Sequence, residues 1–189
     1  MKMKKIIALV LSLMMVLCAF SALAEETTVE KTDMGIMDVN GTFKIQSKLP
    51  EGYSYEPVEV SDLSMIGLLT AGEDKPVIMM SIAYNEQYAD VERFNDLPEE
   101  AVELIRESFK EEDEEATFED LETAYGTRLL KVTDPDFVDI YTVYKGYEME
   151  FYIFTVTEEG ITDADVKMLV DFISDMDFVA LVEEAVAAE

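Results

Sequence analysis

The densest group of side chains with ligand chemistry is an acidic run from Glu111 to Glu115, followed closely by Glu119 and Asp120. Consecutive carboxylates repel one another, and this run follows a predicted helix, whose C-terminal end carries partial negative charge. A hard cation such as Ca²⁺ would relieve both effects, because it takes carboxylate oxygens as ligands. The candidate metal ligands are Glu112, Asp113, Glu115, Glu119 and Asp120.

The alternative interpretation of this run is a solvated acidic loop that ends the helix. The chain contains no D-x-[DN]-x-[DN]-G sequence, which is the signature of a dedicated calcium loop. We therefore expect no cofactor, and the acidic run leaves open only weak, low-affinity Ca²⁺ binding.

Two smaller acid pairs also have a chemical and a structural interpretation. Asp134 and Asp136 flank Pro135, and this spacing suits either a pair of ligands or acid–base groups, or a turn in which Asp accepts from nearby backbone amides. Asp163 and Asp165 fit the first turn of a helix, where negative charge is favourable. In both cases the local structure accounts for the residues without a site.

Tyrosines gather in two adjacent predicted strands, at positions 141, 144, 147 and 152. They could form an aromatic face that binds a ligand. Cross-strand aromatic packing is the ordinary explanation for such a group. Both interpretations stay open at the level of the sequence.

Several classes of function are excluded by composition. The chain has no histidine, which removes Ser-His-Asp and Cys-His nucleophiles and histidine zinc sites. Its 14 Lys and Arg against 42 Asp and Glu give a net charge of −28, which argues against binding nucleic acid or anionic lipid. Two carboxylates suffice for glycoside hydrolysis, but the chain has no Trp for a sugar platform, and no particular pair stands out. We expect a protein that is not an enzyme, with a carboxylate-based hydrolase as an alternative.

The first 24 residues have the three parts of a secretory signal peptide. Lysines at positions 2, 4 and 5 precede an apolar stretch over 6–20, and an A-x-A sequence ends at Ala24. The apolar stretch is about 15 residues long, short of the ~20 that a membrane-spanning helix needs. We expect cleavage after Ala24 and a secreted or periplasmic protein.

Cleavage would change both the cysteine content and the charge. Val16 and Leu17 precede Cys18, where a lipoprotein needs small residues, so we predict no lipid anchor and no stable membrane anchor after signal cleavage. The remaining chain has no cysteine and hence no disulfide. Removal of three lysines and no acid lowers the net charge from −28 to −31.

The rest of the sequence predicts strands and two helices. Helical spacing predicts one helix over 98–110 and a second that begins after Thr162, with Asp165 completing a capping box. Alternation of apolar and polar residues predicts strands near 42–46, 65–70, 77–84, 118–121, 127–132, 137–143 and 147–156. Short strands are possible near 34–37 and 175–178, and residues 53–64 read as a polar connection. The strand over 147–156 has apolar residues on both faces, which predicts a central position.

We predict an α+β fold, a mainly antiparallel sheet with helices packed on its faces in the order β-β-β-α-β-β-β-β-α. The expected organisation is a signal peptide over 1–24, a flexible lead-in over 25–40, a single domain over 41–178 and a C-terminal tail over 179–189.

In pattern and order, residues 40–178 resemble a PsbP-like domain, whose fold is shared with a Ran-binding nuclear import factor. The segments that carry the resemblance are 43–45, 49–53, 98–110, 139–144, 147–155 and 177–178. It implies an antiparallel sheet between helices. Photosynthetic PsbP proteins assist a manganese and calcium cluster, whereas small exported bacterial relatives mostly lack an assigned function. The resemblance carries over no functional residue.

Taken together, these observations predict an exported, non-enzymatic accessory or binding protein that acts outside the cytoplasm. Its partner, a protein or a small ligand, stays unknown, and nucleic acid is excluded by charge. The alternatives are the carboxylate-based hydrolase and a calcium-responsive structural module of the cell surface.

Overall fold

The computed structural model describes residues 31–37, 43–61, 63–72, 74–134, 137–155 and 160–180, and of residues 36, 37, 43 and 177–180 only the backbone. These residues belong to one compact unit. No helix among them is both long and apolar enough to cross a bilayer. The predicted signal peptide, residues 25–30 of the predicted lead-in and residues 181–189 lie outside the described residues.

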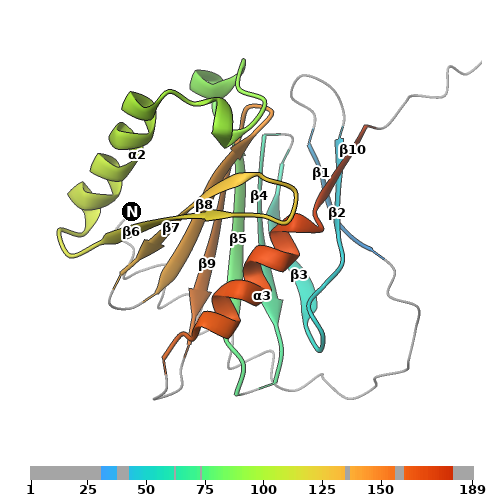
Figure 1. Ribbon diagram of the computed structural model, residues 1–189. Helices are drawn as coiled ribbons and strands as arrows, with labels where there is room; N and C mark the ends of the chain where they lie inside the picture. Colours follow the sequence, from blue (N-terminus) through green and yellow to red (C-terminus); the bar gives the residue numbers. More distant parts are fainter. Residues whose placement is uncertain are drawn as a thin grey trace, which may run out of the picture. The chain divides into compact units, whose positions relative to one another are not determined.

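A seven-stranded sheet forms the centre of the fold (Figure 1). Every neighbouring pair of its strands is antiparallel. In the order in which they lie side by side, the strands are β3 (Ser54–Val60), β4 (Ser64–Thr70), β5 (Val77–Tyr84), β9 (Tyr147–Phe154), β8 (Val138–Tyr144), β7 (Arg128–Thr133) and β6 (Thr117–Glu122). With helices α2 (Glu99–Glu112) and α3 (Asp163–Ser174), this sheet confirms the predicted α+β class.

Strand β9 occupies the central position that its composition predicts. It pairs with β5 on one side and β8 on the other, and its residues alternate between buried and half-buried. Met149, Phe151 and Ile153 point to one face, where they join the main apolar core. Successive side chains of a strand point to opposite faces, so Glu150 and Tyr152 point to the other.

Helix α3 packs on the face that bears Phe151. Its buried residues are Leu169 and Phe172, and the Phe172 ring meets the Phe151 ring edge-on at a centroid distance of 6.2 Å. Figure 1 shows α3 crossing this face of the sheet. The predicted apolar stripe of this helix therefore forms as expected.

Helix α2 packs on the opposite face, at the β6 end of the sheet. Its buried residues Val102 and Ile105 join an apolar cluster with residues of β7 and β8. The other buried members of this cluster are Phe94, Ala116, Leu130, Val132, Tyr141 and Val143. The helix starts one residue and ends two residues later than the predicted 98–110.

A second, three-stranded sheet corrects the predicted boundaries. Strand β1 (Thr32–Met37) lies within the predicted lead-in, and β10 (Asp177–Ala180) takes the first two residues of the predicted tail. Both pair with β2 (Phe43–Ser47). The short strands predicted near 34–37 and 175–178 therefore form, and the domain extends beyond 41–178 at both ends because both strands pair with β2.

Strand β3 corrects the prediction of a polar connection over 53–64. It is the outer strand of the large sheet among the described residues, and nearly all of its side chains are exposed. The alternation of apolar and polar residues in this exposed strand is short, limited to Val58-Glu59-Val60, and so gives only a weak strand signal. Pro57 in its middle also argues against a strand, although proline is tolerated at sheet edges.

Tight turns connect the hairpins as predicted. Between β8 and β9, Lys145 has φ 51° and Gly146 φ 84°. Positive φ at both central residues fits a type I′ turn, whose twist suits a two-residue hairpin. This turn fixes the β8–β9 register, in which Asp139 lies opposite Tyr152.

Candidate functional site

The acidic run that suggested a calcium site surrounds the end of α2. Glu112 is the last residue of the helix and Asp113 follows as its C-cap. The Asp113 Oδ1 accepts a hydrogen bond from the backbone N–H of Glu115 at 2.8 Å. This bond, together with a hydrogen bond from Asp134, lowers the pKa of Asp113. The Asp113 carboxylate therefore helps to end the helix, because it accepts a backbone hydrogen bond just beyond the last turn of α2.

Glu119 and Asp120 point to opposite faces of β6, as consecutive strand residues do. The Lys131 Nζ lies 2.9 Å from a Glu119 oxygen, while the Asp120 oxygens lie at 2.9 and 3.1 Å from Arg128 and Arg106. The five predicted ligands are therefore not gathered at one point. Among the described residues, no group of three or more acidic side chains is arranged to hold a metal ion.

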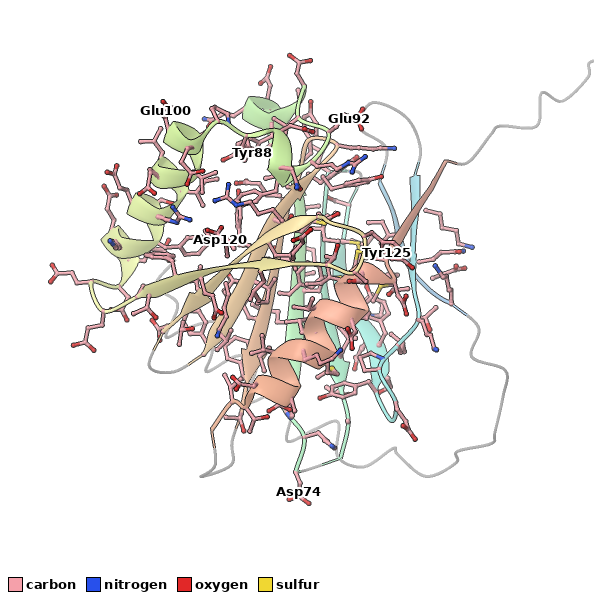
Figure 2. All side chains as sticks on the ribbon, in the orientation of Figure 1. Asp74, Tyr88, Glu92, Glu100, Asp120 and Tyr125 are labelled. Carbon is pink, nitrogen blue, oxygen red and sulfur yellow. The ribbon has the colours of Figure 1, made fainter. Side chains whose placement is uncertain are left out.

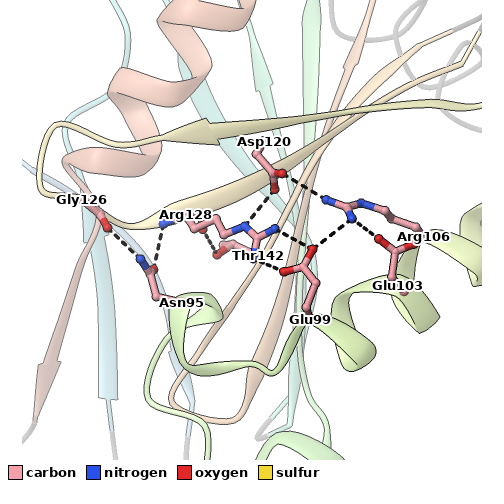
Figure 3. Close-up of polar contacts among 8 residues, drawn as sticks. All are labelled: Asn95, Glu99, Glu103, Arg106, Asp120, Gly126, Arg128 and Thr142. Carbon is pink, nitrogen blue, oxygen red and sulfur yellow. Dashed lines mark hydrogen bonds and ion pairs between the residues drawn. The ribbon is translucent and has the colours of Figure 1, made fainter.

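Asp120 instead belongs to an ion network between α2 and the β6–β7 hairpin (Figure 3). It lies on the side of the hairpin that faces α2 (Figure 2). Arg106 also forms ion pairs with Glu99 and Glu103 on its own helix. Arg128, which lies on β7, forms an ion pair with Glu99. Hydrogen bonds from Arg128 are the main cause that lowers the pKa of both Asp120 and Glu99. This network holds the first half of α2 to the hairpin.

An uncharged link strengthens the same junction. The Asn95 Nδ2 donates to the Gly126 carbonyl at 3.0 Å, and the Arg128 backbone N–H donates to Asn95 Oδ1 at 2.9 Å. The Arg128 guanidinium also lies over the Phe94 ring, 5.7 Å from its centroid. The role of this region is to fix the hairpin against the segment that precedes α2.

A second group of carboxyls lies on β8 and β9, and the sequence analysis did not single it out. Asp139 is 0% exposed, and its Oδ1 accepts from the Phe151 backbone N–H at 3.1 Å. Its Oδ2 is the one buried side-chain polar atom without a hydrogen-bond partner among the described residues. Burial is the main cause that raises the pKa of Asp139 well above its ordinary value, and the charges of Glu150 and Glu112 add to it.

Glu150 and Tyr152 share this environment on the neighbouring strand. Burial raises the pKa of Glu150, partly offset by a hydrogen bond with Tyr152. Burial also raises the pKa of Tyr152, and the charge of Asp139 contributes. Because the Asp139 side chain is completely buried, its carboxyl is not accessible to a substrate in this arrangement.

Glu148, two residues before Glu150, is fully engaged. Its two oxygens accept from the Tyr141 hydroxyl at 2.7 Å and from Asn85 Nδ2 at 2.8 Å. Burial, followed by the charge of Glu148, raises the pKa of Tyr141. This trio ties the β8–β9 pair to the loop that follows β5.

The four clustered tyrosines divide between the two faces of the sheet. Tyr141 belongs to the apolar cluster under α2, whereas Tyr147 belongs to the core under α3. Tyr147 packs edge-on against Tyr84 across the strands, with ring centroids 5.7 Å apart. Tyr152 packs against Phe137 at 5.6 Å. Cross-strand packing therefore accounts for the tyrosines, and they do not form one aromatic face.

The smaller acid pairs serve local structure where they are described. The Thr162 hydroxyl accepts from the Asp165 backbone N–H, and Asp165 accepts from the Thr162 backbone N–H, which confirms the predicted capping box. Asp134 hydrogen bonds with Asp113, and its backbone N–H donates to the Phe137 carbonyl. Pro135 and Asp136 lie outside the described residues.

Exposed large apolar side chains gather at one end of β3. Val58, Val60 and Leu63 are 48, 50 and 56% exposed, and they lie within six residues of one another. Among the described residues, the other large apolar side chains with high exposure are Leu104 on α2 and Tyr125 in the β6–β7 turn. These residues lie in the segment that was predicted to be a polar connection, although the alternation Val58-Glu59-Val60 is a strand signal.

No family model matches the chain, and no curated protein or solved structure shows significant similarity to it.

Proposed function

We propose that this chain is an exported, non-enzymatic accessory domain that binds a partner outside the cytoplasm, through the exposed apolar residues at the end of β3 and in the turn that follows it. The observation that carries the proposal is the exposure of Val58, Val60 and Leu63 on one short segment. Grouped exposed apolar side chains mark interaction sites more often than singly scattered ones do. Export follows from the predicted signal peptide over 1–24, and a PsbP-like architecture is part of the same proposal.

The partner we propose is an extended segment that carries both apolar and basic side chains. Glu56 and Glu59 are exposed on the same strand as Val58 and Val60, and the whole chain has a net charge of −28. Opposite charge on the partner would speed the encounter and fix its orientation. A second copy of this chain would place like charges against Glu56 and Glu59, which disfavours self-association.

We expect the partner to contact the side chains of β3 rather than to pair with its backbone as an additional strand of the sheet. Pro57 has no backbone N–H to donate, and the β3–β4 register shifts between Pro57 and Glu59. A proline and a bulge both blunt an edge strand against pairing with another chain. The apolar side chains of Val58, Val60 and Leu63 stay available.

The environments of the perturbed carboxyl and of the arginines support the non-enzymatic part of the proposal. The most strongly perturbed carboxyl, Asp139, is completely buried, and the arginines of the α2 network are occupied by acids. Neither group is free to act on a substrate in this arrangement. The accessible chemistry of β3 is apolar and acidic, which suits binding.

A synthetic peptide of alternating Val and Lys is a suitable probe, with a peptide of alternating Val and Glu as its charge control. We expect the Val–Lys peptide to bind by calorimetry, and the double variant Val58→Ser, Leu63→Ser to bind it about tenfold more weakly. Leu104→Ser is the matched control, because Leu104 is an even more exposed apolar residue but lies on α2. Equal binding of both peptides, or an equal loss in Leu104→Ser, would contradict the proposal.

A further inference from the structure

Acids from three different elements converge where the end of α2 meets the sheet. Asp139 comes from β8 and Glu150 from β9, and they are diagonal neighbours on one face, since Asp139 lies opposite Tyr152 and Glu150 opposite Tyr141. Glu112, the last residue of α2, acts electrostatically on Asp139 and Glu150. Asp139 is fully buried and one of its oxygens has no partner among the described residues. An ionised Asp139 would therefore meet negative charge and no compensating hydrogen bond on that oxygen.

The other titratable groups around this junction do not supply a positive charge to Asp139. Glu148, next along β9, is occupied by Tyr141 and Asn85, and the Tyr152 hydroxyl shares a hydrogen bond with Glu150. Asp113 and Asp134 hydrogen bond with each other beyond the helix end. Lys110 on α2 lies over the Phe118 ring, 5.5 Å from its centroid, and Lys131 binds Glu119 on the other face of the sheet.

The two ends of α2 are held by different forces. Arg106 and Arg128 anchor its first half through Glu99 and Asp120, acids that stay ionised because the arginines lower their pKa values. The last turn is held by Phe109, whose ring meets Tyr141 at 5.8 Å and Phe118 at 6.5 Å. The second end adjoins the strand residues around Asp139, because Phe109 packs on Phe118, and the register places Phe118 opposite Val132 and Val132 opposite Asp139. We therefore expect that end to respond to the ionisation of Asp139.

We propose that residues 107–116 form a pH-controlled latch: a protonated Asp139 lets them pack on β8 and β9, and its ionisation beside Glu150 and Glu112 loosens them. The first half of α2 stays in place, because its arginine network does not titrate over the same range. The latch thus opens the end of α2 and the loop that leads to β6 as the medium becomes alkaline, and closes them as it becomes acidic.

Amide hydrogen exchange of the purified protein at pH 5 and pH 8, corrected for the intrinsic pH dependence of exchange, tests the latch. We expect residues 107–116 to open about tenfold more readily at pH 8, and residues 99–106 to change little. Asp139→Asn keeps the size of the side chain without its charge, so it should remove most of this difference. Glu150→Gln is a second variant that should weaken it, in case Asp139→Asn fails to fold.

Asp74→Asn is the matched control, since Asp74 is an exposed acid in the β4–β5 turn. It should leave the pH response unchanged. Equal opening over 99–106, or an unchanged response in both Asp139→Asn and Glu150→Gln, would overturn the proposal in favour of general charge repulsion. If millimolar CaCl2 restores protection at pH 8 and NaCl of matched ionic strength does not, the junction is a cation site, which would also overturn it.

Discussion

The Arg128 Nε donates to Asp120 Oδ1 at 2.9 Å across the β6–β7 hairpin. The same guanidinium also donates to Glu99 on α2, so it joins the hairpin to the helix. The Arg128 side chain is only 25% exposed although each acid is about half exposed or more. A partly shielded bidentate arginine with several acids is worth more than an isolated surface pair.

Arg128→Ala should destabilise the fold by about 1–2 kcal/mol, because it removes both ion pairs and the contact with the Phe94 ring. Arg128→Lys should recover only part of this loss, since an ammonium cannot reproduce the fork of the guanidinium. Urea unfolding at low and high salt measures both effects. Lys75→Ala, at an exposed position in the β4–β5 turn, is the control and should change little; a loss as large there would contradict a specific role for Arg128.

Removing the capping hydroxyl in Thr162→Ala should lower the free energy of unfolding by about 1 kcal/mol, because the first turn of α3 loses its side-chain acceptor. Thr162→Ser keeps the hydroxyl and should stay within a few tenths of a kcal/mol of the parent protein. Thermal or urea unfolding of the parent protein and the two variants measures these differences in the free energy of unfolding. Equal stability of the alanine and serine variants would show that the cap is not formed in solution.

Gly67→Ala should cost about 1–3 kcal/mol, because a Cβ at this position would lie 2.3 Å from Tyr55 Cε2. The Tyr55 ring cannot simply swing away, since its hydroxyl donates to the Met34 carbonyl at 2.8 Å and so joins β3 to β1. Gly72→Ala is the matched control, as its Cβ would meet nothing within 4 Å.

The clash between residues 55 and 67 also predicts non-additivity. In a Tyr55→Ala background, Gly67→Ala should cost much less than in the parent protein. Unfolding measurements on the four members of this double-mutant cycle provide the test. An unchanged cost would place the origin of the effect in the backbone of β4 rather than in the Tyr55 ring.

Stability should pass through a maximum at mildly acidic pH. The pKa values of Asp139 and Glu150 are raised in the folded protein. Their contribution to the free energy of unfolding is therefore full below about pH 4, the ordinary pKa of a carboxyl, and is lost as the pH rises through the raised values. The lowered pKa of Asp120 acts in the opposite direction, because its contribution is lost as the pH falls.

Urea midpoints measured from about pH 3 to about pH 8 check this expectation. Asp139→Asn should flatten the alkaline side of the curve and leave the acidic side unchanged. Asp120→Asn should do the reverse, and so serves as the matched variant. A stability that rises steadily up to pH 8 would contradict the burial of an uncharged Asp139.

Two tyrosines should ionise late in an alkaline titration. Burial raises the pKa of both Tyr53 and Tyr55 to about 12, so the stability that they contribute is full below about pH 10 and is lost as the pH rises through about 12. The ultraviolet absorbance of tyrosinate measures this step. Tyr53→Phe and Tyr55→Phe should each remove part of the late ionisation, and a late step that is unchanged in both variants would contradict the burial of these two hydroxyls.

Local patterns determined much of this protein. Features that depend on residues close together in the sequence could be predicted. They are the burial alternation of β9, the hairpin turn at Lys145 and Gly146, the apolar stripe of α3 and its capping box. The α+β class followed from the order of these elements. Composition alone also removed every chemistry that needs histidine.

Other features depended on which strands lie together. Asp139 looks like an ordinary polar residue in a strand, and only the pairing of β8 with β9 under the end of α2 makes it a buried acid beside Glu150. The candidate ligands of the acidic run are not gathered together, because β6 sends Glu119 and Asp120 to opposite faces, where Lys131 and two arginines bind them. Burial and long-range ion pairs are properties of the packed sheet, so residue types along the chain could suggest acidic chemistry, but only the tertiary structure decided where it lies.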